Sequence, residues 1–422
     1  MGYPVKIALI GAGGRGRGYM TYAKNFPDKM QVVAVADPDA VRRNDVAVTY
    51  GIAPEMCFNG WEDFCKLPRM CDAVAICTQD KDHELPAVAC AKLGYHILLE
   101  KPMAPTAQAC RNIVAAVKES GVMLSVCHVL RYTQYTLEIE KIIKSGEIGD
   151  IVSVQHLEPV GYWHHAHSYV RGNWRNEAES SNILLAKCCH DLDWLRGVIG
   201  KKCLSISSFG SLKHFRKENR PEKAADRCCD CPLEVETFCP YSANKIYFRD
   251  RLATGEKSLM KAFYPDPTPD NVGEALRKGP YGRCVFACDN DVMDNQVVNM
   301  IFEDGITASF TMTAFNFWSG RKTRIFGTLG DIETDSSTIT VHHFLDDTTR
   351  SFSVELINPQ GLLLGHNGGD FGLIRDFVDA VSNNDQSLIR SGIDESLESH
   401  LMVFAAEEAR LENKVCELKN FL

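Results

Sequence analysis

The stretch Gly94-Tyr-His-Ile-Leu-Leu-Glu-Lys-Pro102 decides the fold that this sequence predicts. Its apolar run stops abruptly after Leu99 and is followed by Glu100 and Lys101, which is typical of a buried parallel strand with a charged pair at its carboxyl end. Ligands of open α/β sheets bind at that edge. We therefore expect a nucleotide-binding half before this stretch and, after it, the part that brings a substrate to Lys101.

A glycine-rich turn near the start of the chain predicts a dinucleotide site. The apolar strand 5–10 runs into Gly11-Ala-Gly-Gly-Arg-Gly16, and a second apolar strand ends in Asp37. Glycines here allow a tight turn and close approach of a pyrophosphate, and the acid can hold ribose hydroxyls. Asp37 favours NAD, whereas Arg42 and Arg43 leave NADP open. The expected cofactor-binding residues are Gly11, Gly13, Gly14, Arg15, Gly16, Asp37, Thr78, His83, Glu100 and Lys101.

The pattern of strands and helices predicts two domains. Alternation of the two up to about residue 128 indicates a doubly wound parallel sheet. Later segments such as 297–302 and 307–313 alternate apolar and polar residues and are joined by turns, which favours an antiparallel sheet with one covered face. We expect an α/β Rossmann domain over 1–128. An α+β domain with a large, mostly antiparallel open-faced sheet is expected over 129–422, with a Cys-rich insertion at about 213–283.

Composition narrows the class of protein. The 422 residues are 45% hydrophobic and carry a formal net charge of −9, so we expect no nucleic-acid or membrane partner. The opening residues do not resemble a signal peptide, and no apolar segment is long enough to span a bilayer. We therefore expect a cytoplasmic protein whose 17 cysteines are free, core-packed or metal-bound rather than paired in disulfides.

The sequence resembles the Gfo/Idh/MocA family of glucose-fructose oxidoreductase and inositol dehydrogenase. The motifs that carry the resemblance are the glycine turn 11–16, Asp37, Glu100-Lys101-Pro102 and Cys189-His-Asp-Leu-Asp193. The resemblance covers essentially the whole chain. It implies a Rossmann domain followed by an open-faced sheet domain and NAD(P)-linked oxidation or reduction of sugars and polyols. It also implies a homodimer or homotetramer built on the sheet face of the second domain.

The resemblance also implies catalytic residues. Lys101 would contact the nicotinamide ribose and the reacting hydroxyl, where a cation stabilises the developing alkoxide; the alternative is a strand-end lysine paired with Glu100. His190 would accept the proton, and the alternative is a core histidine bonded to backbone. The family often places an aspartate four residues earlier, where this chain has Ala186 followed by Lys187. Lys187 is therefore a third expected catalytic residue and favours a more anionic ligand or an enolate.

The segment 161–175 is rich in side chains that bind carbohydrates. Its aromatic rings can stack on sugar C–H faces, and its polar groups can bond hydroxyls or an acid substituent. A packed surface turn is the alternative. In a later loop, His366 is expected either to cover the site or to be structural, and Asp370 is expected to cap the following helix. The expected substrate-binding residues are Trp163, His164, His165, His167, Arg171, Trp174, Arg175, Asp191 and His366.

Four cysteines in and after the insertion predict a metal site. Thiolates at such spacing can hold a structural zinc tetrahedrally and fix the insertion beside the substrate segment. Cys229 and Cys288 compete for the place of the fourth ligand, free thiols are the alternative, and the spacing fits no familiar iron–sulfur run. The expected metal ligands are Cys228, Cys231, Cys239 and Cys284.

Three functions are consistent with these features. The first is an NAD(P)-dependent oxidoreductase that transfers a hydride between nicotinamide and a secondary hydroxyl of a sugar, glycoside or polyol. The second is an NAD-dependent, redox-neutral glycosidase, in which oxidation, elimination, hydration and reduction follow one another. The third is a nucleotide-binding sensor or scaffold without catalysis. For the first two functions, the expected partner is a small carbohydrate substrate.

Overall fold

The computed structural model describes residues 4–264, 266–355 and 365–421. The strand that precedes Glu100 lies inside sheet A, a six-stranded sheet with the order β3-β2-β1-β4-β5-β6. All of its pairings are parallel, which confirms the doubly wound prediction. Its strands are β1 (Val5–Ile10), β2 (Met30–Ala36), β3 (Cys57–Phe58), β4 (Ala73–Ile76), β5 (His96–Leu99) and β6 (Leu124–Val126).

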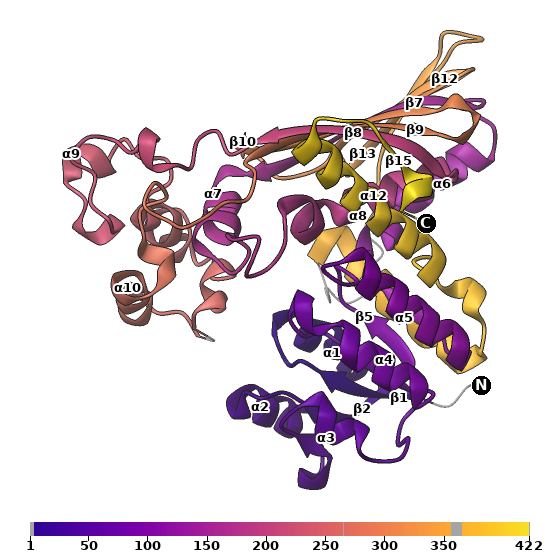
Figure 1. Cartoon of the computed structure of the whole chain (residues 1–422), viewed down its shortest axis with the longest axis horizontal. Coiled ribbons are helices and arrows are strands. Elements are labelled where there is room, and N and C mark those ends of the chain that lie inside the picture. The colour runs from indigo at the N-terminus through magenta and orange to yellow at the C-terminus, as the bar shows by residue number, and fades with distance from the viewer. Residues whose placement is uncertain (1–3, 265, 356–364, 422) are drawn as a thin grey trace.

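Helices cover both faces of sheet A (Figure 1). They are α1 (Gly14–Asn25), α2 (Ala40–Tyr50), α3 (Trp61–Cys65), α4 (Glu84–Lys92), α5 (Ala107–Ser120) and α11 (Gly369–Asn383). Leu9 belongs to the apolar core beneath α1 and α11, while Ile10 belongs to the core beneath α4 and α5, because successive strand residues point to opposite faces. Within the described ranges, no helix is long and apolar enough to cross a membrane.

Two helix ends differ in how they are capped. The Thr106 side chain accepts a hydrogen bond from the backbone N–H of Ala109, and Gly121 ends α5 in the left-handed conformation. The prediction for Asp370 is wrong: α11 starts at Gly369, its N-cap is Gly368, and no side chain caps it. Asp370 lies in the first turn instead and pairs with Arg15.

Sheet B forms the second layer, with the order β14-β13-β12-β11-β7-β10-β9-β8-β15. Only β7 and β10 pair in parallel, so the predicted mostly antiparallel sheet is confirmed. One face packs on α6 (Gln134–Lys144), α8 (Cys189–Ile199) and α12 (Ile393–Glu412). Its strands are β7 (Ile151–Gly161), β8 (Cys203–Ser211), β9 (Asn295–Phe302), β10 (Thr307–Asn316), β11 (Lys322–Gly327), β12 (Gly330–Thr334), β13 (Thr338–His343), β14 (Thr349–Ser353) and β15 (Cys416–Glu417).

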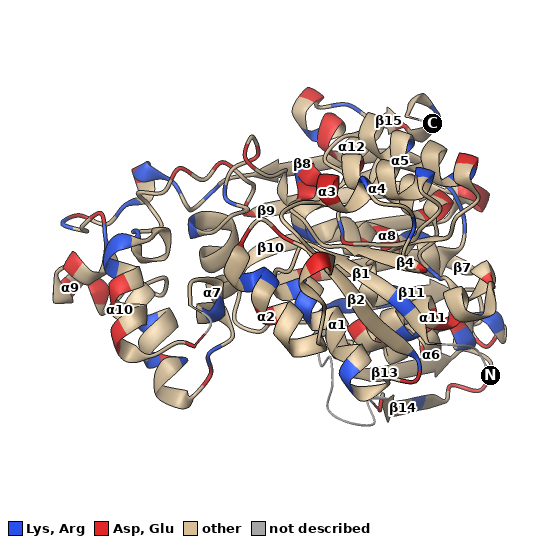
Figure 2. Ribbon diagram, turned by 90° about the horizontal axis from the view of Figure 1, so that it is seen from below, with Lys and Arg blue, Asp and Glu red and all other residues tan. Residues whose placement is uncertain are grey.

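The insertion between β8 and β9 projects from the end of sheet B as a separate lobe (Figure 1). It contains α9 (Leu233–Glu236) and α10 (Pro269–Lys278), and it packs against α7 (Tyr162–His165). The sequence shows little periodicity here because an aromatic cluster, including Phe215, Tyr247 and Phe286, holds the lobe instead of a long amphipathic helix. In this lobe, α10 carries both acidic and basic residues, whereas the charged residues of α9 are acidic (Figure 2).

Gly11 offers a direct test of the turn that follows β1. Its φ is +92°, and an added Cβ would lie 2.5 Å from the Cys77 carbonyl oxygen. We expect Gly11→Ala to lower the free energy of unfolding by about 1–3 kcal/mol and to weaken NAD binding. Gly18→Ala is the matched control, because nothing lies within 4 Å of its Cβ position. Urea unfolding and NAD titration should separate the two variants, and equal losses would contradict the assignment.

Candidate active site

The turn after β1 presents backbone groups at the carboxyl edge of sheet A. A Cβ at Gly16 would overlap the Gly11 carbonyl oxygen, so α1 can pack this closely only with glycine there. Gly13 and Gly14 have no atom within 4 Å of a Cβ position. The start of α1 has neither a side-chain cap nor an acidic residue in its first turn. Its free N–H groups and positive dipole end therefore suit a pyrophosphate.

Asp37 is held directly over this turn. Its carboxylate is buried and accepts hydrogen bonds from the backbone N–H of Ala12 at 2.6 Å and of Asp39 at 2.8 Å. The Arg43 guanidinium donates to the Asp37 carbonyl oxygen, and Arg42 pairs with Asp39 at 3.5 Å. The acid is thus fixed beside the glycine turn, next to two arginines that already have partners.

Glu100 and Lys101 leave the end of β5 in different directions. Glu100 accepts from Arg15 Nε at 2.7 Å and from the Lys101 backbone N–H at 2.7 Å. Burial alone would raise the pKa of Glu100, but the charges of Arg15 and Lys101 outweigh it and hold the pKa below its usual value. The Lys101 Nζ donates to the Ala186 carbonyl oxygen at 2.7 Å. Its ammonium therefore points to the second domain, not to Glu100.

His190 is buried beside this lysine, next to two other histidines. Its ring centroid is 5.6 Å from that of His366 and 5.9 Å from that of His128. Its Nδ1 is buried without a hydrogen-bond partner among the described residues. Burial, followed by the charge of Lys101, holds the pKa of His190 well below its usual value. Near neutral pH the ring is therefore uncharged and can accept a proton.

A buried charge network supports the site from sheet B. Arg321 Nη2 lies 2.9 Å from Glu158 Oε2, and its Nε lies 2.6 Å from Asp191 Oδ1. Lys187 Nζ lies 3.4 Å from the other oxygen of Glu158, and His156 Nε2 lies 3.0 Å from Asp191 Oδ1. Sequence reasoning missed Glu158 and Arg321, because they come from different strands or loops and no local spacing joins them.

The residues before His190 reach this network through an unusual turn. Residues Leu184–Cys188 form a π-helical turn, a form that occurs often at functional sites. It presents both the Ala186 carbonyl oxygen and the Lys187 ammonium. His164 comes from α7; burial, then the charges of Lys187 and Lys101 among others, holds its pKa well below the usual value. Lys101, Lys187, His164, His190 and His366 are thus brought together from four segments of the chain, since Lys187 and His190 share one continuous helical run.

Other predicted residues are directed elsewhere, because the insertion docks on the predicted substrate segment. Arg171 donates to backbone oxygens of Arg283 and Tyr241, and Arg175 forms a paired salt bridge with Asp289 at 2.9 Å. Five other predicted substrate-binding residues contact the insertion, the core or the charge network around Arg321. They are His165 (buried against Phe215), His167 (bonded to Tyr247), Trp163 (beneath Arg251), Trp174 (against Tyr169) and Asp191 (bonded to Arg321).

Two predicted cofactor residues brace loops of the Rossmann domain. The His83 ring is fully buried, with Nδ1 2.8 Å from the Pro102 carbonyl oxygen and Nε2 3.3 Å from that of Thr78. Thr78 Oγ1 donates to the Asp82 carbonyl oxygen. His83 therefore joins the loop after β4 to the residues that follow Lys101, and it supports the site from behind.

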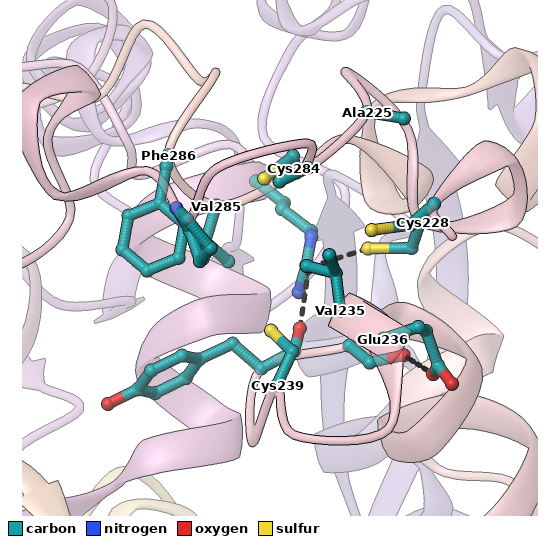
Figure 3. A pocket seen from close by; sticks show the side chains of 14 residues that line it. Ala225, Cys228, Val235, Glu236, Cys239, Cys284, Val285 and Phe286 are labelled. Carbon is teal, nitrogen blue, oxygen red and sulfur yellow. Dashed lines mark hydrogen bonds between the residues drawn. The ribbon is translucent and has the colours of Figure 1, made fainter. Parts of the chain in front are cut away.

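The four predicted metal ligands line one cavity of about 20 Å³ together with Arg171 (Figure 3). In the described residues, however, no three His, Cys, Asp or Glu side chains are placed to hold a metal ion. The predicted tetrahedral arrangement is therefore not preformed, because the Arg171 guanidinium lies among the thiols, 3.5 Å from Cys228 Sγ. Of the rival ligands, Cys229 is exposed and Cys288 Sγ donates to the Cys284 carbonyl oxygen.

A parallel sheet with a glycine turn at its carboxyl edge, followed by an open-faced mixed sheet, defines a two-domain dinucleotide-binding oxidoreductase. Residues 5–128 match the model of the oxidoreductase family with an NAD-binding Rossmann fold, and residues 140–418 match that of its C-terminal alpha/beta domain. The chain belongs to the Gfo/Idh/MocA family of oxidoreductases.

Two relatives and one solved structure show what this chain is similar to. YteT of Bacillus subtilis (strain 168) is 22% identical over 346 residues, which are 76% of this chain and 75% of that protein. The 2,7-anhydro-N-acetylneuraminate hydratase of Escherichia coli (strain K12) is 28% identical over 193 residues, 45% of this chain and 49% of that protein. A levoglucosan dehydrogenase in complex with NADH shares the fold, with a TM-score of 0.70 and 18% identity over 98% of this chain and 99% of that one.

Arg321 is expected to be the most costly side chain of the network to remove. Arg321→Met would leave Asp191 and Glu158 buried without this cation, so we expect a loss of about 3–5 kcal/mol in unfolding free energy. Arg324→Met is the matched control, because this nearby arginine is about half exposed and should change stability by less than about 0.5 kcal/mol. Chemical denaturation measures both, and a small loss for Arg321→Met would contradict the role of the network.

Buried neutral histidines should make stability depend on pH. Burial lowers the pKa of His165 to about 4. Between about pH 6.5 and 4, this histidine is therefore protonated in the unfolded chain but not in the native state. We expect the free energy of unfolding to fall as pH drops from about 6.5 to 4, and His165→Phe to reduce this slope by up to about 1.4 kcal/mol per pH unit. His342→Gln, in β13, is the control. Urea unfolding at several pH values checks this, and an unchanged slope in His165→Phe would refute it.

Proposed function

We propose that this protein transfers a hydride between NAD(P) and a secondary hydroxyl of a sugar, glycoside or polyol. The observation that carries the proposal is that the Lys101 ammonium, bonded to the Ala186 carbonyl oxygen, lies close enough to the buried His190 to lower the pKa of its ring. A cation and a neutral base at one point suit a hydroxyl that must lose its proton. The NADH complex of the levoglucosan dehydrogenase supports a carbohydrate substrate.

The dinucleotide fits the residues at the glycine turn. The N–H groups of Gly13 and Gly14 and the positive end of α1 would hold the pyrophosphate, and Asp37 would hold the adenosine ribose hydroxyls. When bound, NAD supplies the hydride acceptor of the reaction. Because Asp37 repels a 2′-phosphate, we infer a preference for NAD, although Arg43 beside it keeps NADP as the alternative.

Separate residues of the chain then accept the hydroxyl proton and stabilise the charge left on the oxygen. His190 takes the hydroxyl proton on its imidazole, and the Lys101 ammonium stabilises the developing negative charge on the oxygen. The Ala186 carbonyl oxygen orients Lys101 through the 2.7 Å hydrogen bond. Lys187, held by Glu158, adds a second cation for an anionic substituent of the substrate or for an enolate.

A redox-neutral glycosidase is the second candidate, and it is favoured by Lys187, which follows Ala186 at the position of a family aspartate. Lys101 and Lys187 both lie close enough to His164 to lower its pKa, so two cations border the same space. They can stabilise the enolate that forms when a ketone next to a C–H lets the aglycone leave. The relative named as an anhydro-sugar hydratase also supports chemistry without net redox change.

A nucleotide-binding sensor or scaffold is the non-enzymatic alternative. The retention of Lys101 and His190, with their orienting contacts, argues against it. We also infer a cytoplasmic location, because all 17 cysteines are free, which suits a reducing compartment. Apolar side chains on the open face of sheet B support a homo-oligomer built on that face, among them Val152, Leu204, Phe209, Val297 and Ile301.

Lys101→Ala tests the catalytic assignment. We expect kcat/KM to fall about 10²- to 10⁴-fold while NAD still binds, because the lysine acts on the reacting oxygen and the turn after β1 is untouched. Lys92→Ala is the matched control, since Lys92 is exposed at the end of α4. Steady-state kinetics and NAD titration give both quantities, and near-normal turnover in Lys101→Ala would refute the role of this lysine.

A panel of free sugars, polyols and chromogenic glycosides separates the two enzymatic candidates. NADH and released aglycone are followed in the same sample with NAD present. Accumulating NADH would establish the dehydrogenase. Aglycone that appears without net NADH, and only when NAD is present, would establish the glycosidase. Neither signal across the panel would favour the sensor or scaffold.

A further inference from the structure

Arg171 carries a charge that the described protein atoms do not balance. Its side chain is fully buried, and within the described ranges no carboxylate lies in salt-bridge distance of it. Nε donates to the Arg283 carbonyl oxygen and Nη2 to that of Tyr241, both at 2.7 Å, while Nη1 has no partner among the residues that the structure describes. A buried cation without an opposing charge is strongly unfavourable, so an anionic group is needed at this place.

Thiols surround this guanidinium on several sides. Cys228 Sγ lies 3.5 Å from Arg171 Nη2, and Cys231, Cys239 and Cys284 line the same cavity. In Figure 3, Cys228, Cys239 and Cys284 approach the cavity from different sides. These residues belong to loops and short turns, so the lobe has brought them together without a common helix or strand.

Backbone contacts hold the distant cysteines side by side. The Cys284 N–H donates to the Asp226 carbonyl oxygen at 2.8 Å, and Arg227 forms an isolated β-bridge with Arg283. The Asn244 side chain donates to the Cys228 carbonyl oxygen. The start of the cysteine-containing insertion is therefore tied to the segment that follows it, independently of any bond between sulfur atoms.

The four thiols line the same cavity as this guanidinium, so they are the groups that can meet its charge. A divalent ion with four thiolates carries a net charge of −2, and Arg171 would offset part of it through N–H to sulfur hydrogen bonds.

We propose that Cys228, Cys231, Cys239 and Cys284 bind one soft divalent metal ion of the zinc class, with Arg171 Nη1 donating to a ligand sulfur. The cavity of about 20 Å³ is close to the size that holds one water molecule, which suits a single ion and not a cluster. Because the thiols are not yet placed to coordinate, their side chains must turn inward to reach about 2.3 Å from the metal. Each thiol releases its proton to solvent as its sulfur binds.

The proposed ion would connect the insertion to the active-site wall. Arg171 ends the π-helical turn Ala166–Arg171, which follows directly on α7 and its His164. Fixing Arg171 therefore fixes the segment that carries His164 beside Lys187. The ion has a structural role here, and this inference does not depend on which reaction the protein catalyses.

The test uses the full-length protein, stripped with a chelator and then given Zn²⁺ or Co²⁺. We expect about one Zn²⁺ per chain by elemental analysis. The Co²⁺ form should show the thiolate-to-metal charge-transfer absorption and the intense visible bands of a tetrahedral sulfur site. Cys231→Ser should reduce the metal content to below about 0.2 ions per chain and abolish the charge-transfer band. Cys229→Ser is the matched control, because Cys229 is exposed beside Cys228, and it should retain both signals.

NAD titration shows whether each variant keeps its Rossmann domain folded. Arg171→Met, with all four thiols intact, should weaken zinc affinity about 10- to 100-fold, as losses of outer-shell partners do. The proposal is overturned if the folded wild-type protein takes up no metal, if the Co²⁺ spectrum lacks thiolate bands, or if Cys231→Ser binds as well as the wild type.

Discussion

The ion pairs of Arg15 hold the active-site edge together. Arg15 Nε lies 2.7 Å from Glu100 and its Nη2 lies 2.7 Å from Asp370, so one guanidinium joins the turn after β1, the end of β5 and the start of α11. Glu100 also accepts the Lys101 backbone N–H. The position of Lys101 thus depends on a contact with a helix that lies about 270 residues later in the chain. No local pattern in the sequence indicates this contact.

At this edge of the site, a cation lies beside a neutral histidine. Lys101 lies beside a histidine whose pKa burial and nearby positive charge both depress. The result is a cation next to a neutral base, the combination that stabilises an alkoxide and accepts its proton. Behind them, the charge of Arg321 outweighs the effect of burial on the pKa of Asp191 and holds it far below the usual value, and Arg321 also pairs with Glu158.

The segment 161–175 contributes both to the active site and to the contact with the insertion. Its beginning, including His164, faces the cations of the active site. Its end, from Arg171 to Arg175, is bonded to the insertion and to the loop that follows it. The same run of aromatic and polar residues therefore looks like a continuous carbohydrate-binding stretch, but the lobe covers most of it. Substrate recognition and docking of the insertion are consequently linked through one short piece of backbone.

The sequence by itself determined the parallel sheet, the glycine turn, Asp37, and the pairing of Lys101 with His190 as candidates. Each of these is encoded locally, by buried apolar runs, by glycines at positions with positive φ or close packing, and by motif spacing. Only the tertiary structure decided that Arg15 pairs with Asp370, that Arg321 joins Glu158 to Asp191, and that Arg171 lies among four cysteines. These contacts join side chains far apart in the chain, and their energy comes from burial and opposite charge, which no local pattern records.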